Sequence, residues 1–211
     1  MSNQVVVYVD AYNFYHSMKR AQWPEYLKWT SYRRLAALLT HRDDLVVTKV
    51  FSAEATHFPE SLGRQHLWFA AQRSDGCELI LGNFKKKARS CRFCHAEWMG
   101  HEEKETDVNI GIHLVQDTWL YPEARIILIT NDTDLLPALK MVKGNHPSKR
   151  ITLARVDRLH PSLARIASDQ QKVSQEMMRQ ALMPAEIQGA HSLIKRPEEY
   201  APPPEIRVPE R

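Results

Sequence analysis

Residues 126–140, IILITNDTDLLPALK, decide how the chain folds. Residues 126–129 are apolar and largely β-branched, which is typical of a strand buried on both faces of a sheet. This pattern stops at the polar run 130–134, and apolar residues then recur at helical spacing. Asp132 and Asp134 therefore lie where a buried strand ends and a helix begins. Ligands of open α/β sheets bind at such ends, but the same residue types cap helices, so this stretch alone leaves both interpretations open.

Two other stretches place an acidic residue in a similar position. Residues 5–9, VVVYV, form another buried-strand pattern that ends at Asp10, with Asn13 close behind. Asp107 lies in the first turn of a helix that we predict over residues 104–119. Carboxylates that meet in one crevice repel one another unless a cation joins them. A set of oxygen ligands with few nitrogens favours Mg²⁺ or Mn²⁺ over zinc.

The rest of the chain alternates strand and helix patterns, which implies right-handed crossovers and an α/β fold. We expect a mainly parallel central sheet flanked by helices, in one domain over residues 1–183. Residues 184–211 are rich in proline and charge and are predicted to form an extended or disordered tail. Further strands are predicted over residues 45–51, 78–81, 124–129 and 150–156, and further helices over 14–20, 32–40, 59–73, 135–143, 161–168 and 174–182.

Composition sets broad limits. The formal charge of +4 and the pI near 9.0 permit a nucleic-acid partner without requiring one. Three cysteines do not suggest a disulfide framework, so we expect a reduced, cytoplasmic protein. No signal-peptide pattern and no apolar run of membrane-spanning length is present in the sequence.

Several common α/β chemistries lack their sequence signatures. There is no dinucleotide-binding G-x-G-x-x-G after the first strand, no P-loop and no G-x-S-x-G nucleophile elbow. Carboxylates with a few amides and hydroxyls remain as candidate catalytic groups. A divalent ion on such carboxylates is typical of phosphodiester cleavage, because it orients the phosphate and stabilises the departing oxygen.

Three motifs together carry a family resemblance. They are DAYN at residues 10–13, EKETDV at 103–108 and TNDTD at 130–134. Their order and spacing resemble the D-x-x-N, E-K-x-x-D-V and S-G-D-x-D pattern of the NYN domain, in the bacterial LabA-like branch of the PIN-like nuclease superfamily. The resemblance covers about residues 4–170 and extends to the Cys-x-x-Cys insert.

The resemblance implies a PIN-like three-layer fold and metal-dependent ribonuclease activity on RNA. Carried over residue by residue, Asp10, Asp107 and Asp132 would hold Mg²⁺ or Mn²⁺. Asn13 would position a phosphate or a water, and Asp134 would complete the acidic cluster or orient the attacking water.

This chain departs from the family pattern at two places, where Ala11 and Asn131 stand in place of glycine. A side chain at either place narrows the approach of a polymer backbone.

The insert at about residues 85–101, KKKARSCRFCHAEWMGH, has no clear period and is interpreted as a loop. Cys91 and Cys94 have the spacing of half a zinc site, and a structural zinc needs four ligands. Candidates for the others are His95, His101 and Cys77. The alternative is a reduced, metal-free pair, and a homodimer would result if two inserts completed one site.

The basic part of the insert could border the acidic crevice and neutralise phosphates. Phe84, Phe93 and Trp98 could offer stacking faces, while the alternative is a solvated basic loop. The predicted substrate-binding residues are Lys85, Lys86, Lys87, Arg89, Lys104, Thr130 and Asn131.

Two other functions compete with the ribonuclease. One is a non-catalytic RNA-binding module on the same fold, although a binding module has no need for the acids. The other is a small-molecule catabolic enzyme, a hydroxylase or monooxygenase acting on a pyridine-type compound, because some proteins resembling this branch have such a role. No flavin or nicotinamide fingerprint in the sequence supports the latter.

Overall fold

The computed structural model describes residues 4–41 and 44–208. Its main sheet has seven strands in the order β4-β3-β2-β1-β5-β6-β7, and all neighbours are parallel except β3 and β4. The predicted α/β class with a mainly parallel sheet is therefore confirmed. The strands are β1 (Gln4–Asp10), β2 (Asp44–Ala53), β3 (Glu78–Ser90), β4 (Glu97–Lys104), β5 (Arg125–Ile129), β6 (Ile151–Arg155) and β7 (Asp169–Lys172).

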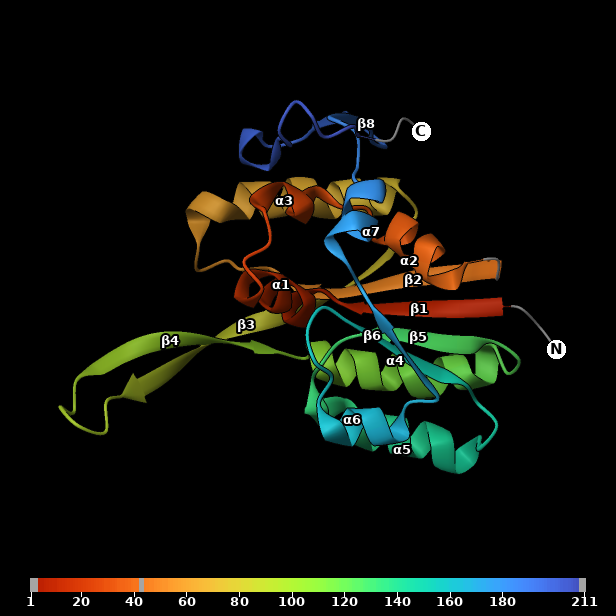
Figure 1. Cartoon of the computed structure of the whole chain (residues 1–211). Coiled ribbons are helices and arrows are strands. Elements are labelled where there is room, and N and C mark those ends of the chain that lie inside the picture. The colour runs from red at the N-terminus through yellow and green to blue at the C-terminus, as the bar shows by residue number, and fades with distance from the viewer. Residues whose placement is uncertain (1–3, 42–43, 209–211) are drawn as a thin grey trace.

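Helices cover both faces of the sheet (Figure 1). One layer contains α1 (Ala11–Arg20), α2 (Tyr32–Thr40), α3 (Pro59–Ser74) and α7 (Gln175–Gln180). The other contains α4 (Thr106–Leu120), α5 (Leu136–Asn145) and α6 (Pro161–Ile166). The described residues also form three short 3-10 helices: η1 (Glu25–Trp29), η2 (Thr133–Leu135) and η3 (Glu198–Tyr200).

The central strand β1 explains why its sequence is apolar at every position. Val5, Val7 and Val9 point into the core beneath α1 and α2, whereas Val6 and Tyr8 point into the core beneath α4 and α5. All five are 0% exposed. The predicted strand over residues 5–9 is thus buried on both faces, as a parallel sheet between two helical layers requires.

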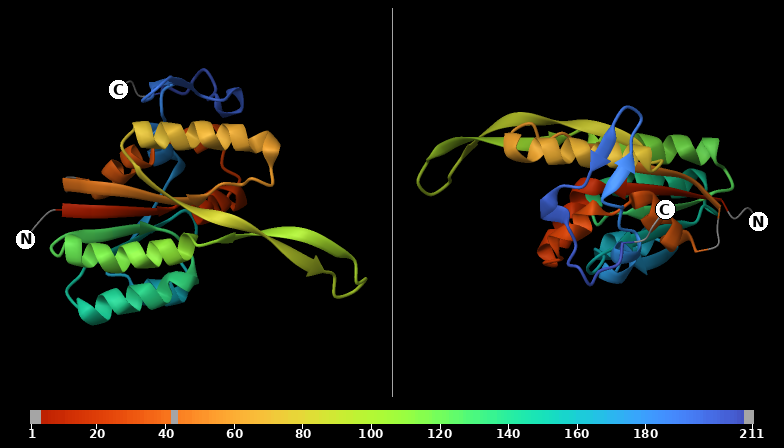
Figure 2. Two further views of the ribbon diagram at one scale, coloured as in Figure 1. Left: turned by 180° about the vertical axis from the view of Figure 1, so that it is seen from behind. Right: turned by 90° about the horizontal axis from the view of Figure 1, so that it is seen from above.

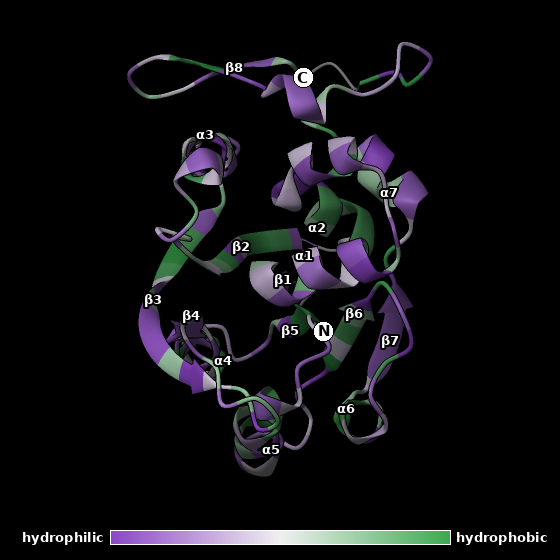
Figure 3. Ribbon diagram, turned by 90° about the vertical axis from the view of Figure 1, so that its left-hand side faces the viewer, coloured by the Kyte–Doolittle hydropathy of each residue, from purple (hydrophilic) through white to green (hydrophobic). Residues whose placement is uncertain are grey.

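The segment interpreted as an inserted loop is instead an antiparallel hairpin, which we call the arm. β3 extends to Ser90 rather than ending near residue 81, and it pairs with β4 from Asn83↔Lys104 to Ser90↔Glu97. The arm projects beyond the carboxyl ends of the parallel strands (Figure 2). In Figure 3, β3 changes from hydrophobic to hydrophilic along its length, because its second half leaves the core. That exposed half lacks the alternation of apolar and polar residues from which a strand is predicted.

Two further differences concern the last third of the chain. The polar strand β7 was not predicted, since an edge strand needs little apolar surface. After residue 183, the chain forms a small two-stranded hairpin of β8 (Glu186–Gln188) and β9 (Leu193–Lys195). Ile187 and Ile194 of this hairpin are buried in a cluster with Trp29 and Ala71.

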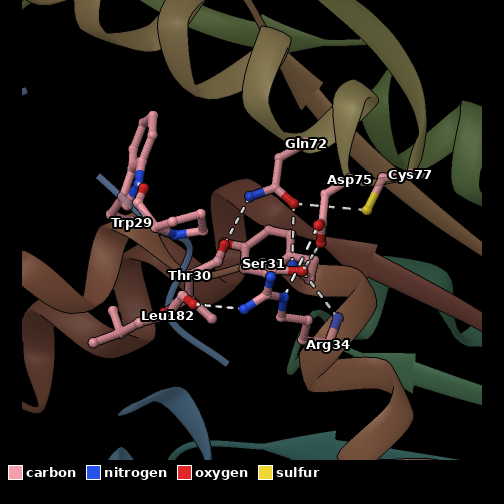
Figure 4. A network of polar contacts seen from close by, with 10 residues as sticks. Trp29, Thr30, Ser31, Arg34, Gln72, Asp75, Cys77 and Leu182 are labelled. Atoms are coloured by element: carbon pink, nitrogen blue, oxygen red, sulfur yellow. Dashed lines mark hydrogen bonds and ion pairs between the residues drawn. The ribbon is translucent and has the colours of Figure 1, made fainter. Parts of the chain in front are cut away.

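Polar contacts fix the route into this C-terminal segment (Figure 4). Arg34 donates to the Leu182 carbonyl at 3.1 Å, and the Trp29 indole donates to the Pro184 carbonyl at 2.9 Å. Gln72 of α3 accepts from the backbone N–H of Tyr32 and donates to the Thr30 carbonyl. These bonds join the segment to α2 and η1, and Gln72 joins α3 to the start of α2. No helix within the described ranges has the length and apolar character needed to cross a membrane.

Candidate active site

Three acidic residues converge at the carboxyl edge of the sheet, which faces the viewer in Figure 3. Asp10 ends β1, Asp107 lies in the first turn of α4, and Asp132 follows β5. Each offers one carboxylate oxygen, and these oxygens all lie within 4.8 Å of one another. β1 and β5 are neighbouring parallel strands, so their ends meet at the same edge.

Asp10 is the buried member of the cluster, only 3% exposed. Its Oδ1 accepts from the backbone N–H of Asn13 at 3.0 Å, and its Oδ2 accepts from the Thr130 hydroxyl at 2.9 Å. Burial raises the pKa of Asp10 to about 7, and the charges of Asp107 and Asp132 add to that rise. The two hydrogen bonds oppose the rise without cancelling it.

Asp107 is half-buried and also titrates abnormally. Partial burial raises its pKa to about 6, helped by the negative charges of Asp132, Glu103 and Asp134. Glu103 also accepts a hydrogen bond from the backbone N–H of Thr106 at 3.1 Å, which holds the first turn of α4. Two carboxyl groups with raised pKa values in one crevice indicate a place where a cation would relieve repulsion.

Asp132 both caps a helix and belongs to the cluster. Its Oδ1 accepts from the backbone N–H of Asp134 at 2.9 Å, at the start of η2. Its own N–H donates to the Thr130 hydroxyl oxygen at 3.1 Å. Capping therefore does not exclude a second role, because Asp132 caps η2 and also offers a carboxylate oxygen to the acidic cluster. Asp134 is exposed and is not one of the three converging residues, but its charge acts on Asp107.

Asn13 and Asn131 hold the loop that carries Asp132. The Asn13 side-chain oxygen accepts from the backbone N–H of Asn131 at 3.0 Å. The Asn131 side chain in turn donates to the Arg158 carbonyl at 3.1 Å and accepts from the backbone N–H of His160 at 2.8 Å. Its amide is thus engaged by the loop after β6, a role that the sequence did not suggest.

Apart from Asn131, the predicted substrate-binding residues divide into three groups. Thr130 is buried and bonded to Asp10, so it positions an acid. Lys87 and Lys104 both pair with Glu102 on the arm, at 2.7 and 3.3 Å. The exposed arm residues Lys85 and Lys86 and the cavity-lining Arg89 complete the set.

The structure does not assemble the predicted zinc ligands within one chain. Cys91 and Cys94 lie at the tip of the arm, but His101 lies in β4 opposite Lys86. Cys91 is therefore about 16 Å farther along the strand, at about 3.3 Å per residue. Cys77 is buried beside Gln72. Across residues 4–41 and 44–208, Asp10, Asp107 and Asp132 form the one group of three or more potential ligands.

A large cavity beside the acidic cluster was missed by sequence reasoning. It has a volume of about 910 Å³ and lies between α1, α3 and the arm, with η3 at its border. Tyr12, Tyr15 and His16 reach it from α1. Their spacing of three and four residues places them on one helix face, which is a signal that the sequence offered. The contributions of His57 and Trp68 depend on how α3 sits and could not be seen.

Comparisons with known proteins agree with this architecture. A model of the NYN domain matches residues 4–175. The chain is 28% identical over 180 residues to 6-hydroxy-3-succinoylpyridine 3-monooxygenase HspA of Pseudomonas putida, covering 69% of this chain. That alignment spans only 57% of the relative's length. A crystal structure of a protein of unknown function from Vibrio parahaemolyticus superposes with a TM-score of 0.55 at 19% identity, over 82% of this chain and 94% of that one. This last likeness concerns the fold alone.

Proposed function

The chain belongs to the NYN domain family, and from that premise we propose that it is a metal-dependent ribonuclease of the LabA-like, PIN-like kind. It hydrolyses RNA phosphodiester bonds at a Mg²⁺ or Mn²⁺ ion held by Asp10, Asp107 and Asp132. The observation that carries this proposal is the convergence of three carboxylate oxygens from separate elements.

The residues at the site suit a hard divalent cation. All three donors are carboxylates, and oxygen donors are what Mg²⁺ and Mn²⁺ prefer. Without a cation, Asp10 and Asp107 have pKa values of about 7 and about 6, so the cluster resists holding full charge. When bound, the ion supplies charge neutralisation and activation of the phosphate towards water.

The surrounding residues hold the acids in place for this reaction. Thr130 and the N–H of Asn13 fix both oxygens of Asp10, and Asn13 also fixes the Asp132 loop through Asn131. In our proposal, Asp134 accepts a proton from the attacking water or orients that water. Its carboxylate is exposed and lies near enough to Asp107 to raise that residue's pKa.

The test is cleavage of single-stranded RNA by the purified chain with Mg²⁺ or Mn²⁺, with EDTA, and as the Asp132→Asn variant. Asp169→Asn is the matched control, because Asp169 is an exposed carboxylate on β7 outside the cluster. We expect metal-dependent cleavage by the wild type and the control, and a loss of at least about a hundredfold in Asp132→Asn. Equal cleavage by Asp132→Asn would sink the proposal.

A small-molecule catabolic enzyme is the second candidate. The similarity to a pyridine-compound monooxygenase motivates it, although the chain spans 57% of that relative's length. The cavity of about 910 Å³ also falls in the usual size range of ligand pockets, about 300–1,000 Å³. An ultraviolet–visible spectrum of the purified protein separates the two, since a flavin or iron band would favour this candidate. A non-catalytic RNA-binding module would bind RNA without cleaving it.

We also propose that two copies of the chain share a structural zinc ion through their arms. Cys91 and Cys94 supply two of the four ligands that such a site needs, and a second copy supplies the other two. Within one chain, the turn that carries Cys91 and Cys94 is closed by two backbone hydrogen bonds. The Cys91 N–H donates to the Ala96 carbonyl at 2.9 Å, and the His95 N–H donates to the Cys91 carbonyl at 3.0 Å. Phe93 beside the pair is 97% exposed and would be covered by the partner's arm.

Zinc content and solution mass test this site. We expect one zinc per two chains and a dimer for the wild type, and a zinc-free monomer for Cys94→Ser. Ser90→Ala, an exposed change on the same arm, should behave as the wild type. A wild-type monomer that stays metal-free when purified with added zinc would contradict the proposal.

A further inference from the structure

A continuous row of aromatic rings leads away from the acidic cluster along the cavity. The centroids of rings in contact are 4.1–6.0 Å apart, and the row branches at its end, where both Phe58 and His101 contact His57. The row joins three parts of the fold, namely α1, the segment before α3, and the arm. We call it the aromatic row, and its members are His16, Tyr12, Phe84, His57, Phe58 and His101.

The row begins next to the acids. Tyr12 lies two residues after Asp10 on the first turn of α1, and its ring meets Phe84 edge-on at 6.0 Å. Phe84 pairs across the arm with Glu103, the residue whose carboxylate caps α4 just before Asp107. A chain held on the row would therefore pass the acidic cluster.

Two rings of the row, and one further ring that lines the cavity, are exposed to solvent. Tyr12 is 43% exposed and Phe58 is 59% exposed, and Trp98, which also lines the cavity, is 50% exposed. Rings that served only the core would be buried, as Phe69 and Phe51 are at 2% and 0%. Exposed aromatic faces at several points along one cavity suit a ligand with several flat rings of its own.

The charges around the cavity favour an anionic chain. Four cationic side chains line it, with only two carboxylates, Glu25 and Glu199. The cations come from α1, η1, α3 and the arm, so they surround the row on several sides. They are Lys19, Lys28, Arg64 and Arg89. Lys28 pairs with Glu25 and Arg64 pairs with Glu199, so these two cations are already partly neutralised.

The arm is shaped to bring one of these cations inward. Gly100 in β4 lies under the Arg89 side chain, and a Cβ at this position would come within 2.7 Å of Arg89 Nε. Arg89 can therefore lie across the strand and reach the cavity that Trp98 and Gly100 also line. The arm thus contributes both a ring and a charge.

We propose that the aromatic row is a base-stacking site for a single-stranded segment of the RNA substrate, whose phosphates are held by Lys19 and Arg89, with Lys28 and Arg64 adding positive charge. The inference rests on the proposed ribonuclease function and names the substrate class of the same site. An unpaired strand is required because a free base can place its face against a protein ring, whereas bases in a duplex already stack on one another. In this arrangement the arm, α1 and α3 form one side of the substrate channel.

Binding without cleavage tests the inference. The probe is a fluorescent single-stranded oligoadenylate of about ten nucleotides, within the usual range of such sites. Its affinity is measured by anisotropy in EDTA with Asp132→Asn protein, so the strand stays intact. We expect Tyr12→Leu and Phe84→Leu each to weaken binding about tenfold, because each removes a stacking face. Tyr12→Phe should keep the affinity, because it keeps the ring.

Two controls make the result specific. Trp119→Leu removes a more exposed ring, 68% exposed on α4 in the opposite helical layer, and should leave binding unchanged. A blunt duplex of matched length should bind more weakly than the single strand and should be indifferent to Tyr12→Leu.

The binding and cleavage experiments can reject the stacking site and the proposed ribonuclease function independently of each other. If Tyr12→Leu and Phe84→Leu bind the single strand as tightly as their parent, the row is not a stacking site, whatever the cleavage assay gives. If the duplex loses affinity in these variants as much as the single strand does, the preference for unpaired RNA is wrong. Loss of binding in the row variants, combined with no cleavage by the wild type, would uphold the stacking site and reject the nuclease.

Discussion

The carboxyl group of Asp10 binds its proton more tightly in the folded chain than in the unfolded one. Its pKa rises from an ordinary 3.8 to about 7, chiefly because the side chain is buried. Between these pH values the metal-free folded chain carries a proton that the unfolded chain has released. Raising the pH therefore removes stability in this window, and a bound cation would restore it.

We predict that the free energy of unfolding in EDTA falls as the pH rises from about 4 to about 7, by at most about 1.4 kcal/mol per pH unit from this one group. Urea denaturation across this range measures the slope. Asp10→Asn should reduce the slope, since an amide does not titrate, and should leave the share of Asp107, whose pKa is also raised, to about 6. Asp169→Asn should leave the slope unchanged. An unchanged slope in Asp10→Asn would show that another group dominates.

Asn131 occupies a position where the family usually has glycine, and its role in this chain is structural. Its amide makes hydrogen bonds to the backbone of Arg158 and His160, and lies 3.4 Å from Asp157 Oδ1. Restoring glycine would open the loop but would remove these contacts.

We predict that Asn131→Gly lowers the free energy of unfolding by about 1–3 kcal/mol, the cost of lost hydrogen bonds plus added backbone freedom. Thermal denaturation at fixed pH measures this change. Metal affinity should fall as well, because the loop that carries Asp132 then loses its side-chain contacts with the loop after β6. A variant as stable as the wild type would mean that the loop is held by other contacts.

At the scale of elements, α4 decides where Asp107 lies, and both of its ends are fixed. Near its carboxyl end, Asp117 is buried and accepts hydrogen bonds from Tyr8 at 2.7 Å and from Lys49 at 2.9 Å. At its start, Gly82 of β3 lets the helix approach the sheet closely. A Cβ at Gly82 would lie 2.5 Å from the Lys104 carbonyl oxygen and 2.9 Å from Thr106 Oγ1.

We predict that Gly82→Ala displaces the first turn of α4 and with it Asp107. The expected result is about a tenfold or greater loss of divalent-metal affinity, measured by calorimetric titration, because coordination tolerates little misplacement. Gly144→Ala is the matched control, since a Cβ there has nothing within 4 Å. Equal affinity in Gly82→Ala would show that the turn adjusts without moving the acid.

At the scale of the whole molecule, the C-terminal segment closes the helical layer that contains α3. Ile187 and Ile194 are 1% and 5% exposed and pack with Trp29, which is 0% exposed. The domain boundary predicted at residue 183 stays a prediction. The described part of the segment nevertheless has its own contacts with the core.

We predict that Ile187→Ala costs about 2–4 kcal/mol of unfolding free energy, because a buried side chain is truncated and leaves a cavity. Leu193→Ala, at a neighbouring position that is 47% exposed, should cost less than about 1 kcal/mol. Urea denaturation of both variants distinguishes a docked segment from a loose one. Equal, negligible effects would mean that the segment does not pack in solution.

How far the sequence alone leads is clearest at the three acids. Buried-strand patterns before Asp10 and Asp132 placed both acids at strand ends and Asp107 at a helix start, and the resemblance to the NYN domain then implied that the three hold one metal. The spacing of apolar residues, and the turn residues that bound each apolar run, determine strands and helices. The carboxyl ends of neighbouring parallel strands lie together at one edge of the sheet. The α/β class follows from the same alternation.

The arm, the aromatic row and the role of Asn131 were decided by the tertiary structure. The exposed half of β3 has no alternating pattern, so its pairing with β4 left no signal. The rings of the row come from residues as distant in sequence as His16 and His101, and the partners of Asn131 lie in another loop. Local patterns record which residues are buried on an element, whereas side-chain partners depend on where separate elements meet in space. For this reason the sequence predicted the acids at the site and suggested Phe84, Trp98 and Arg89 for contact with a substrate, but it did not predict the cavity that brings them together with rings of α1.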